Sequence, residues 1–550
     1  MRKNSSFLIV SVIVAITWCV LHLPAIIYGT NNIPLHVSYL TADEQSPVNG
    51  ALHVLQSKSI LGLQNQNTLY YGPVIAMLAV PAVLVDFGYR YVTGQIAHPL
   101  DYKNVVVWDW GGILIWARFT AVIGGLLGIV AMYLLFSTRT LNPTQDRWLP
   151  WIAACLLASN YLFFEYSGAF RHWVFMVTLL LWQFLIVIRT LEAERNRTVL
   201  WVWQVILAVC SFGISYLGLL YQVFWIPVLY SWWKKKNWLC LKEWGYHVGG
   251  VLVGMVLMIL WHPYGFLRTF GLFRFVSSAP SSSAPIPDVS RVSVIFDSFL
   301  YNLDIILINN IALVLVGIYM VWLVRNKVLR LGFISLVVLF PALANFFFFS
   351  IHAHNESRYM LPTVVLLVVL VLVLYSQTLA TFGDQCSVKR VCYIFFITVL
   401  GVGMIQILGL VRMQAYGPPE RALILPQIHA WQREYPGTRT LVVKNWPLGY
   451  VHTEEAYEDY INRYDKRTYE LWQYILIASQ PHDIEPINVF YKHQYEPITE
   501  EDVRNYDHVV LHYPPQVDSV APESPQDVFD LKPWTVWNFV NHQETYTILK

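Results

Sequence analysis

Long apolar segments, separated by short charged loops, constrain this chain more than any other feature. Of its 550 residues, 56% are hydrophobic and only 13% are charged, whereas about 25% of the residues of a typical soluble domain are charged. A helix needs about 20 apolar residues to cross a bilayer. The sequence therefore predicts a mainly α, polytopic membrane protein, and it gives no reason to expect a nucleic-acid partner.

The apolar runs predict a helical bundle of about 11 spans. They lie near residues 7–28, 112–137, 148–165, 173–189, 199–215, 217–232, 246–262, 301–324, 331–350, 360–381 and 391–411. The first run follows Met1-Arg2-Lys3 and is longer than the apolar core of a signal peptide. We therefore expect it to be retained as a helix.

Basic residues gather in every second short loop, and this pattern predicts the orientation. They are Arg2, Lys3, Arg139, Arg147, Arg189, Arg195, Arg197, Lys234, Lys235, Lys236, Lys242, Arg325, Lys327, Arg330, Lys389 and Arg390. Such loops face the cytoplasm, so we expect a cell (inner) membrane protein with its C-terminus outside. Residues 73–85 are also apolar, but a single crossing there would move the later basic loops outside. We interpret them as a re-entrant or juxtamembrane helix within an external loop over 28–111.

The chain is predicted to have two domains, a transmembrane catalytic domain over 1–411 and a soluble extracytoplasmic α/β domain over 412–550. Hydropathy falls after Arg412, and acidic residues outnumber basic ones there. Alternating apolar residues predict strands at 440–443, 488–491 and 508–512. The stretch 454–478 is helix-like. With no catalytic motif visible, this domain is expected to shape or dock the acceptor.

A second external loop, over 262–300, contains the Ser/Pro/Ala-rich stretch 277–285. Such composition is typical of a flexible segment. It is either a lid that orders over bound substrate or a plain exposed connector.

The adjacent carboxylates Asp43 and Glu44 closely follow the first predicted span. A carboxylate at the water face of a membrane bundle can accept a proton from a substrate hydroxyl, or can hold a cation beside a lipid-borne substrate. We predict that this pair forms the catalytic centre.

Four arginines are predicted to lie outside, close to the bilayer surface, namely Arg171, Arg268, Arg274 and Arg358. The guanidinium group can bind phosphate oxygens through two donors at once. Each arginine therefore either contacts the phosphate of a lipid-linked substrate or snorkels beside the lipid headgroups. Arg118 is expected to have a structural role at the start of the second span.

Histidines near two predicted helix ends raise the question of a metal. His352, His354 and Glu356 fall within five residues, and His262 ends another span. They form either a divalent-cation site for Mg²⁺ or Mn²⁺, with Asp43, Glu44 and His354 as ligands, or an ordinary hydrogen-bonded polar rim. The motif at 108–111, Trp-Asp-Trp-Gly, is interpreted as an aromatic anchor at the membrane interface.

Several short motifs occur in an order that resembles a known group of enzymes. They are Ala42-Asp43-Glu44, Tyr71-Gly72-Pro73, Ala117-Arg118-Phe119, Arg171-His172 and Arg358-Tyr359-Met360-Leu361-Pro362. Over about residues 7–411, the chain resembles the GT-C superfamily of polyprenyl-phosphate-dependent glycosyltransferases, in the branch of protein O-mannosyltransferases and lipid A aminoarabinose transferases.

The resemblance implies roles for several of these residues. Asp43 matches the external aspartate taken as the base, and Arg358 with Tyr359 matches the Arg-Tyr pair near the lipid phosphate. Where relatives often have an acidic residue after the third helix, this chain has Arg171-His172, with Glu165 shortly before.

The predicted activity is transfer of a sugar from a polyprenyl-phosphate donor to a hydroxyl of a lipid, glycan or protein. The alternatives are a transporter or lipid-linked sugar flippase, and a non-catalytic assembly subunit. A transporter would need its site near the bilayer midplane.

Overall fold

The structure is a computed structural model in which part of the chain is described. The described residues are 2–28, 30, 42–60, 72–192, 197–215, 217–218, 238–263, 291–309, 333–351, 357–382, 386–416, 421–444, 453, 455–456, 458–459, 488–493, 499–512, 527–530 and 545–548. The chain forms two compact units. Unit 1 comprises Met1–Ile26, Ser46–Val85 and Leu114–Val411, and unit 2 comprises Ile27–Gln45, Asp86–Ile113 and Arg412–Lys550.

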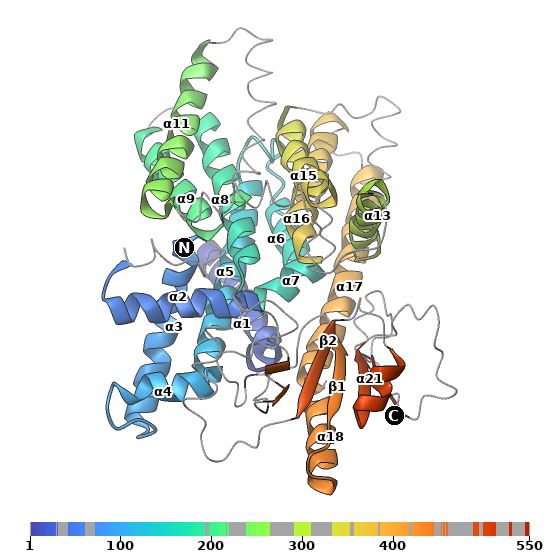
Figure 1. Ribbon diagram of the computed structural model, residues 1–550. Helices are drawn as coiled ribbons and strands as arrows, with labels where there is room; N and C mark the ends of the chain where they lie inside the picture. The colour runs from blue at the N-terminus through green and yellow to red at the C-terminus, as the bar shows by residue number, and fades with distance from the viewer. Residues whose placement is uncertain are drawn as a thin grey trace. The chain divides into compact units, whose positions relative to one another are not determined.

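Helices make up nearly all of the described residues up to 416 (Figure 1). They are α1 (Arg2–Ile27), α2 (Ala42–Ser57), α3 (Pro73–Val92), α4 (Asp101–Trp108), α5 (Gly111–Phe136), α6 (Leu149–Ala158), α7 (Tyr161–Ser167), α8 (His172–Glu192), α9 (Arg197–Ile214), α11 (Trp238–Trp261), α13 (Arg291–Asn309), α15 (Phe333–Ile351), α16 (Ser357–Phe382) and α17 (Cys386–Tyr416). The prediction of a mainly helical bundle is confirmed.

Within the described residues, six helices are long and apolar enough to cross a membrane, and five more apolar helices are shorter. The chain is an integral membrane protein. The number of spans stays a prediction, because 219–237 and 310–332, which carry parts of two predicted runs, lie outside the described residues. The lid prediction for 277–285 lies outside them too.

The run at 148–165 was predicted to be one continuous helix, and this is wrong. It forms two short helices, α6 and α7, that are separated at Ser159 and Asn160. Asn160 has an extended backbone, and its side chain accepts a hydrogen bond from the backbone N–H of Phe163 at 3.1 Å. Such an N-cap begins a new helix, so α7 starts there as a separate element.

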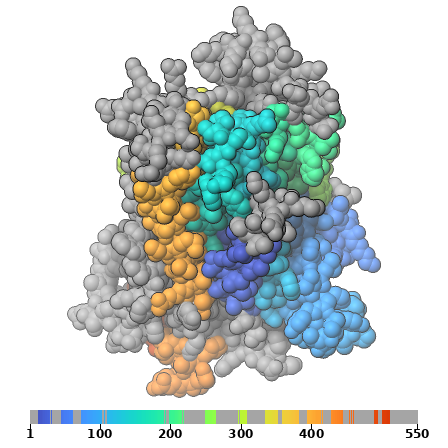
Figure 2. Space-filling model, turned by 180° about the vertical axis from the view of Figure 1, so that it is seen from behind, coloured from blue at the N-terminus to red at the C-terminus, as the bar shows by residue number. Residues whose placement is uncertain are grey.

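Close helix packing in unit 1 depends on small residues. Helix α9 packs against α8 and α11, and α15 packs against α16 (Figure 1). A Cβ at Gly254 of α11 would lie 2.7 Å from the Cβ of Ala208 in α9, so only glycine permits this approach. Helix α17 instead lies at the surface (Figure 2), where Ile394, Ile397 and Ile405 are exposed. Such a face suits contact with lipid.

Arg118 of α5 is fully buried and donates hydrogen bonds to the carbonyl oxygens of Ala25 and Ile26, at 3.2 and 3.4 Å. These carbonyls belong to the last turn of α1, where backbone acceptors have no partner within the helix. A cation also interacts favourably with the negative end of the helix dipole. Arg118 therefore has the predicted structural role, since it attaches α5 to the last turn of α1.

The C-terminal part of unit 2 contains a mixed sheet with the strand order β2-β1-β3-β5-β4. Its elements are α18 (Arg421–Glu434), β1 (Thr440–Lys444), β2 (Val489–His493), α21 (Glu500–Asn505), β3 (His508–His512), β4 (Asp527–Asp530) and β5 (Thr545–Ile548). β1 pairs in parallel with β2 and β3, whereas β5 is antiparallel to β3 and β4. The α/β prediction and its three strands are confirmed, while β4 and β5 were not predicted.

One face of this sheet forms a small apolar core. Leu441, Val443, Phe490 and Val509 are all less than 4% exposed and pack together with Tyr506. Lys492 shares this face and lies beside Val443 in the register. Its ammonium group forms a buried salt bridge with Asp502 of α21. This ion pair therefore attaches α21 to the sheet.

The stability that the Lys492–Asp502 salt bridge provides depends on pH through the pKa of Asp502. Burial raises the pKa of the Asp502 carboxyl, but hydrogen bonds from Lys492 and Thr499 outweigh this effect, so the pKa lies below its ordinary value of 3.8. A depressed carboxyl pKa stabilises the folded state above the unfolded pKa. The contribution of Asp502 is therefore present above pH 3.8 and is lost as the pH falls further.

Lys492→Met should lower the free energy of unfolding of this sheet by about 3–5 kcal/mol at neutral pH, because it leaves a buried carboxylate without its cation. Urea unfolding of the full chain, followed by pulse proteolysis, measures the loss. The double variant Lys492→Met/Asp502→Leu should recover most of it, since no charge is then buried alone. Equal instability of the single and double variants would contradict a structural role for the pair.

Candidate functional site

The clearest polar cluster of unit 1 lies where α7 ends and where α8 and α16 begin. The hydroxyls of Tyr166 in α7 and Ser357 in α16 share a hydrogen bond of 2.7 Å, although 191 positions separate them in sequence. Gly168 ends α7, and a Cβ there would lie 2.7 Å from the Cβ of Ala25. The turn that follows leads to Arg171 and the first residue of α8, His172. We call this group the Tyr166 cluster.

Two arginines belong to the Tyr166 cluster. The guanidinium carbon of Arg171 lies 5.8 Å from the centroid of the Tyr166 ring. That of Arg358 lies 5.1 Å from the Tyr359 ring, and its Nη2 donates a hydrogen bond of 3.3 Å to the Tyr359 hydroxyl. Arg171 is only 8% exposed, so its side chain packs inside the chain instead of extending to the surface as a snorkelling residue does.

Each arginine is adjacent to the start of a long helix. Arg171 immediately precedes α8, and Arg358 is the second residue of α16. Helix N-termini present free N–H groups and the positive end of the helix dipole, which together favour anions. Two guanidinium groups and two helix N-termini therefore outweigh the single carboxylate of Glu165 and make this region electropositive.

The pKa of the Tyr166 hydroxyl reflects the charged groups that surround it. Burial raises the pKa of the Tyr166 hydroxyl, and Glu165 adds to the increase, while Arg171, the hydrogen bond with Ser357 and Arg358 act in the opposite direction. Tyr166 therefore stays a neutral phenol. The opposing effects also show that Glu165 and both arginines lie close enough to Tyr166 to influence one hydroxyl.

Aromatic side chains hold the beginning of α16 in place. The Tyr359 ring stacks on Phe349 of α15 at 4.6 Å between centroids and meets the edge of Trp173 at 5.2 Å. Asn345 of α15 donates one hydrogen bond to the Tyr359 carbonyl oxygen and another to the Thr363 hydroxyl, both of 2.8 Å. The backbone next to Arg358 is thus fixed from two sides, which limits the movement of its guanidinium group.

The structure brings five of the predicted site residues into one cluster. They are Glu165, Arg171, His172, Arg358 and Tyr359. Sequence reasoning did not find Tyr166 and Ser357, which link them, because this hydrogen bond joins residues far apart in the sequence and neither residue lies in a recognisable motif. His262 is fully buried where α11 ends. Arg268, Arg274, His352 and His354 lie outside the described residues.

The predicted catalytic pair lies in unit 2, in the first turn of α2. Glu44 is fully buried, although a water-facing carboxylate was expected. The side chain of Asp43 is outside the described part of the structure. Among the described residues, no group of three or more His, Cys, Asp and Glu side chains could hold a metal ion. Because the side chains of Asp43 and His354 are not among them, the Mg²⁺ or Mn²⁺ site stays a prediction.

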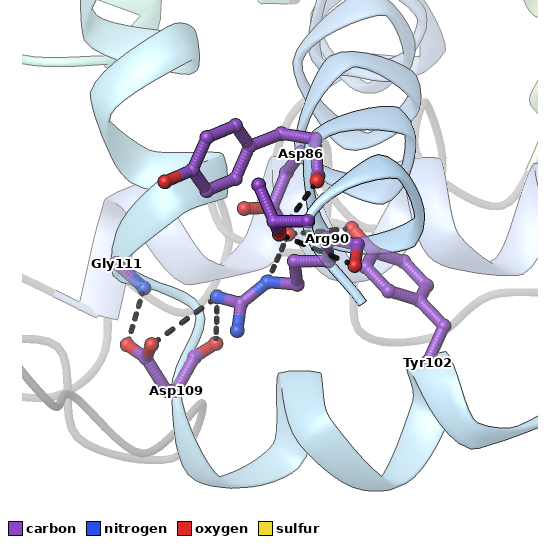
Figure 3. Close-up of polar contacts among 7 residues, drawn as sticks. Asp86, Arg90, Tyr102, Asp109 and Gly111 are labelled. Carbon is purple, nitrogen blue, oxygen red and sulfur yellow. Dashed lines mark hydrogen bonds and ion pairs between the residues drawn. The ribbon is translucent and has the colours of Figure 1, made fainter. Parts of the chain in front are cut away.

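Unit 2 contains a buried ionic network that the sequence did not suggest (Figure 3). Arg90 of α3 donates to the Asp86 carboxylate at 2.9 Å and to the Asp109 carboxylate at 3.2 Å. The Tyr102 hydroxyl of α4 also donates to Asp86, at 2.9 Å. Asp109 in turn accepts from the backbone N–H of Gly111, the first residue of α5, at 3.1 Å. The network therefore joins α3, α4 and the start of α5.

The interpretation of the Trp108-Asp109-Trp110-Gly111 motif as an aromatic anchor is wrong for Trp110. Trp110 is fully buried, so it is a packed residue, while the side chain of Trp108 lies outside the described residues. The Asp109 carboxylate forms a salt bridge with Arg90 and accepts a hydrogen bond from the backbone N–H of Gly111. A Cβ at Gly112 would lie only 1.9 Å from an Asp86 carboxylate oxygen, which explains why glycine follows the motif.

Comparisons with known proteins give structural likenesses only. No protein-family model matches the sequence, and no curated protein does. Among solved structures, the chain is similar to ArnT from Cupriavidus metallidurans in the apo state, at 14% identity and a TM-score of 0.48, over 80% of this chain and 83% of that chain. It is also similar to the same protein bound to undecaprenyl phosphate, at 12% identity and a TM-score of 0.47, over 99% of this chain and 98% of that chain.

Arg90→Met should destabilise the protein by about 3–5 kcal/mol, because it leaves the buried Asp86 carboxylate without its cation. Gly112→Ala should act in the same direction, since the added methyl group displaces Asp86. Thermal unfolding of the detergent-solubilised chain checks both variants. Arg433→Met, which removes an exposed cation of α18, is the control. A similar loss for Arg90→Met and Arg433→Met would mean that the network contributes little.

Proposed function

We propose that this protein is a membrane glycosyltransferase that takes a sugar from a polyprenyl-phosphate donor and that the Tyr166 cluster binds the donor phosphate. The observation that carries the proposal is the convergence of Arg171 and Arg358 with the N-termini of α8 and α16. Such an arrangement suits a phosphate group, because guanidinium groups and helix N-termini both donate hydrogen bonds to its oxygens. The order of motifs in the sequence, which resembles that of the GT-C superfamily, supports the same function.

The chemistry requires a base as well as an anion site. In the proposed reaction, an acceptor hydroxyl attacks the anomeric carbon of the sugar, and the bond from that carbon to the phosphate oxygen breaks. The polyprenyl phosphate leaves with a negative charge that Arg171 and Arg358 would stabilise. A carboxylate accepts the proton of the acceptor hydroxyl. We assign this role to Asp43 from its sequence motif.

Glu44 suits the base role less well than Asp43. A general base must come within hydrogen-bonding reach of the acceptor hydroxyl, whereas the side chain of Glu44 is fully buried. The sugar is a hexose or a pentose, and the acceptor is a lipid, a glycan or a protein. We propose that transfer takes place on the extracytoplasmic side of a cell membrane, because the motifs fall in the loops that the positive-inside rule assigns to that side.

Arg358→Ala should weaken binding of the lipid phosphate by about ten- to a hundredfold, because it removes a charge-assisted contact of about 1.5–3 kcal/mol. Arg358→Lys should restore only part of the affinity, since lysine lacks the two-donor geometry. Undecaprenyl phosphate, the molecule bound in one of the ArnT structures, serves as the probe in a detergent-based binding measurement. Arg171→Ala is expected to behave like Arg358→Ala.

Arg147→Ala is the matched control, because Arg147 also lies over a neighbouring aromatic ring, that of Trp148 at 5.3 Å, but is exposed. Its affinity for undecaprenyl phosphate should equal that of the unmodified chain. If Arg358→Ala lowered thermal stability but left this affinity unchanged, Arg358 would be a structural residue and the donor-site assignment would fail.

Asp43→Asn should lower the rate of sugar transfer by about 10²–10⁴, the usual loss when a general base is removed. Binding of undecaprenyl phosphate should be retained, because the change leaves the Tyr166 cluster intact. The measurement is transfer of a labelled sugar from a polyprenyl-phosphate donor. Glu434→Gln, at an exposed carboxylate of α18, should transfer sugar at the normal rate. Normal turnover by Asp43→Asn would exclude Asp43 as the base.

A further inference from the structure

The indole N–H of Trp173 is buried and, among the described residues, has no hydrogen-bond partner. Trp173 is the second residue of α8, and its side chain is only 1% exposed. Nearly all buried N–H groups in folded proteins are paired, and an unpaired one calls for a physical reason, of which a functional role is one. The indole N–H is therefore a candidate for contact with a ligand.

The chemistry of the indole limits what this ligand atom can be. A buried donor without an acceptor destabilises the folded state. A phenylalanine at position 173 would bury an aromatic ring without this cost, because its ring has no polar atom. The indole N–H only donates hydrogen bonds. Its partner must therefore be an acceptor, such as a ligand oxygen.

The Trp173 ring lies beside residues of the Tyr166 cluster. Its centroid is 5.2 Å from that of the Tyr359 ring in α16 and 4.3 Å from that of the His172 ring. The guanidinium carbon of Arg358 lies 5.1 Å from the centroid of the same Tyr359 ring. The Tyr359 ring therefore contacts both the indole of Trp173 and the guanidinium group of Arg358.

Trp173 also lies in the first turn of α8, two residues after Arg171. The first four backbone N–H groups of a helix have no acceptor within that helix. Helix α8 packs against α16, and Arg358 lies in the first turn of α16. Tryptophan and arginine side chains donate hydrogen bonds and accept none. Three side chains that only donate thus lie near the starts of two packed helices.

We propose that the indole N–H of Trp173 donates a hydrogen bond to a phosphate oxygen of the polyprenyl-phosphate substrate. The inference rests on the proposed function and adds a neutral group to the two arginines of that site. A phosphate that links a sugar to a lipid is a diester, and all of its oxygens are acceptors. A sugar hydroxyl, in contrast, brings a donor hydrogen that needs an acceptor of its own. As the sugar leaves, charge develops on the phosphate and strengthens the contact with the indole.

Trp173→Phe tests the proposal, because it removes the N–H group and keeps an aromatic ring. The detergent-solubilised full chain with this change should bind undecaprenyl phosphate about tenfold more weakly than the unmodified chain. Trp110→Phe is the matched control. Trp110 is also fully buried, its indole N–H also has no hydrogen-bond partner among the described residues, and it belongs to unit 2. Its replacement should leave the affinity for undecaprenyl phosphate unchanged.

The comparison of the two variants separates binding from a structural role. Both changes remove one buried indole, so both lower the Tm, whereas only Trp173→Phe should weaken binding of undecaprenyl phosphate. An equal loss of affinity in Trp173→Phe and Trp110→Phe would assign the effect to general destabilisation and overturn the proposal.

A spectroscopic measurement on the unmodified chain tests the hydrogen bond directly. When the indole rings carry nitrogen-15, each tryptophan N–H group gives its own NMR signal, and a hydrogen bond to phosphate shifts the proton signal downfield. Undecaprenyl phosphate should shift the signal of Trp173 in this way. Loss of one signal in Trp173→Phe identifies it. Trp173→Met, which fills the space with a flexible apolar side chain, identifies it if Trp173→Phe does not fold. An unmoved signal at saturating undecaprenyl phosphate would overturn the proposal.

The same measurements distinguish failure of this inference from failure of the proposed function. If the unmodified chain does not bind undecaprenyl phosphate, the proposed phosphate site is wrong, and the role of Trp173 is wrong with it. If the unmodified chain binds undecaprenyl phosphate and Arg358→Ala weakens this binding but Trp173→Phe does not, only the role of Trp173 is wrong.

Discussion

Backbone polar groups that lie at membrane depth must find their hydrogen-bond partners within the protein, and much of this structure follows from that constraint. It explains why apolar runs form helices, and it makes helix ends the places where polar side chains are needed. Arg118 shows the consequence most directly. Its buried guanidinium group donates to the carbonyl oxygens of Ala25 and Ile26. One cation thus provides hydrogen bonds to the last turn of α1 and attaches α5 to it.

The same constraint locates the proposed site. Charged side chains are costly inside a bilayer, so a membrane enzyme is expected to place them where helices begin and end. In unit 1, Arg171 precedes α8 and Arg358 belongs to the first turn of α16. The hydrogen bond between Tyr166 and Ser357 brings these two helix starts together. An electropositive region of this kind favours an anionic ligand, and the phosphate of a polyprenyl donor satisfies that preference.

In unit 2, buried charges are used to hold the fold together. Asp86, Arg90 and Asp109 form a network in which every carboxylate has a cationic or N–H partner. Lys492 and Asp502 do the same in the sheet. Removing one member of such a group destabilises the folded state by more than the intact group stabilises it, because a single charge is then left buried without a partner.

The sequence by itself determined the class of the protein and much of its layout. Apolar runs of the right length predicted the membrane helices, and alternating apolar residues predicted β1, β2 and β3, because both patterns depend on local periodicity. The sequence also identified Arg171, His172, Arg358 and Tyr359 as candidate site residues. It could not show the break between α6 and α7, where the cap formed by Asn160 overrides an otherwise continuous apolar run.

Only the tertiary structure decided which polar residues meet. The partners Tyr166 and Ser357 are 191 positions apart, and Arg90 and Asp109 are 19 positions apart. Neither pairing follows from local periodicity, since both depend on how separate helices pack. The pairing of the strands likewise placed β1 between β2 and β3, with Lys444 opposite His493. Periodicity along the chain therefore specified the elements, and packing between elements specified the sites.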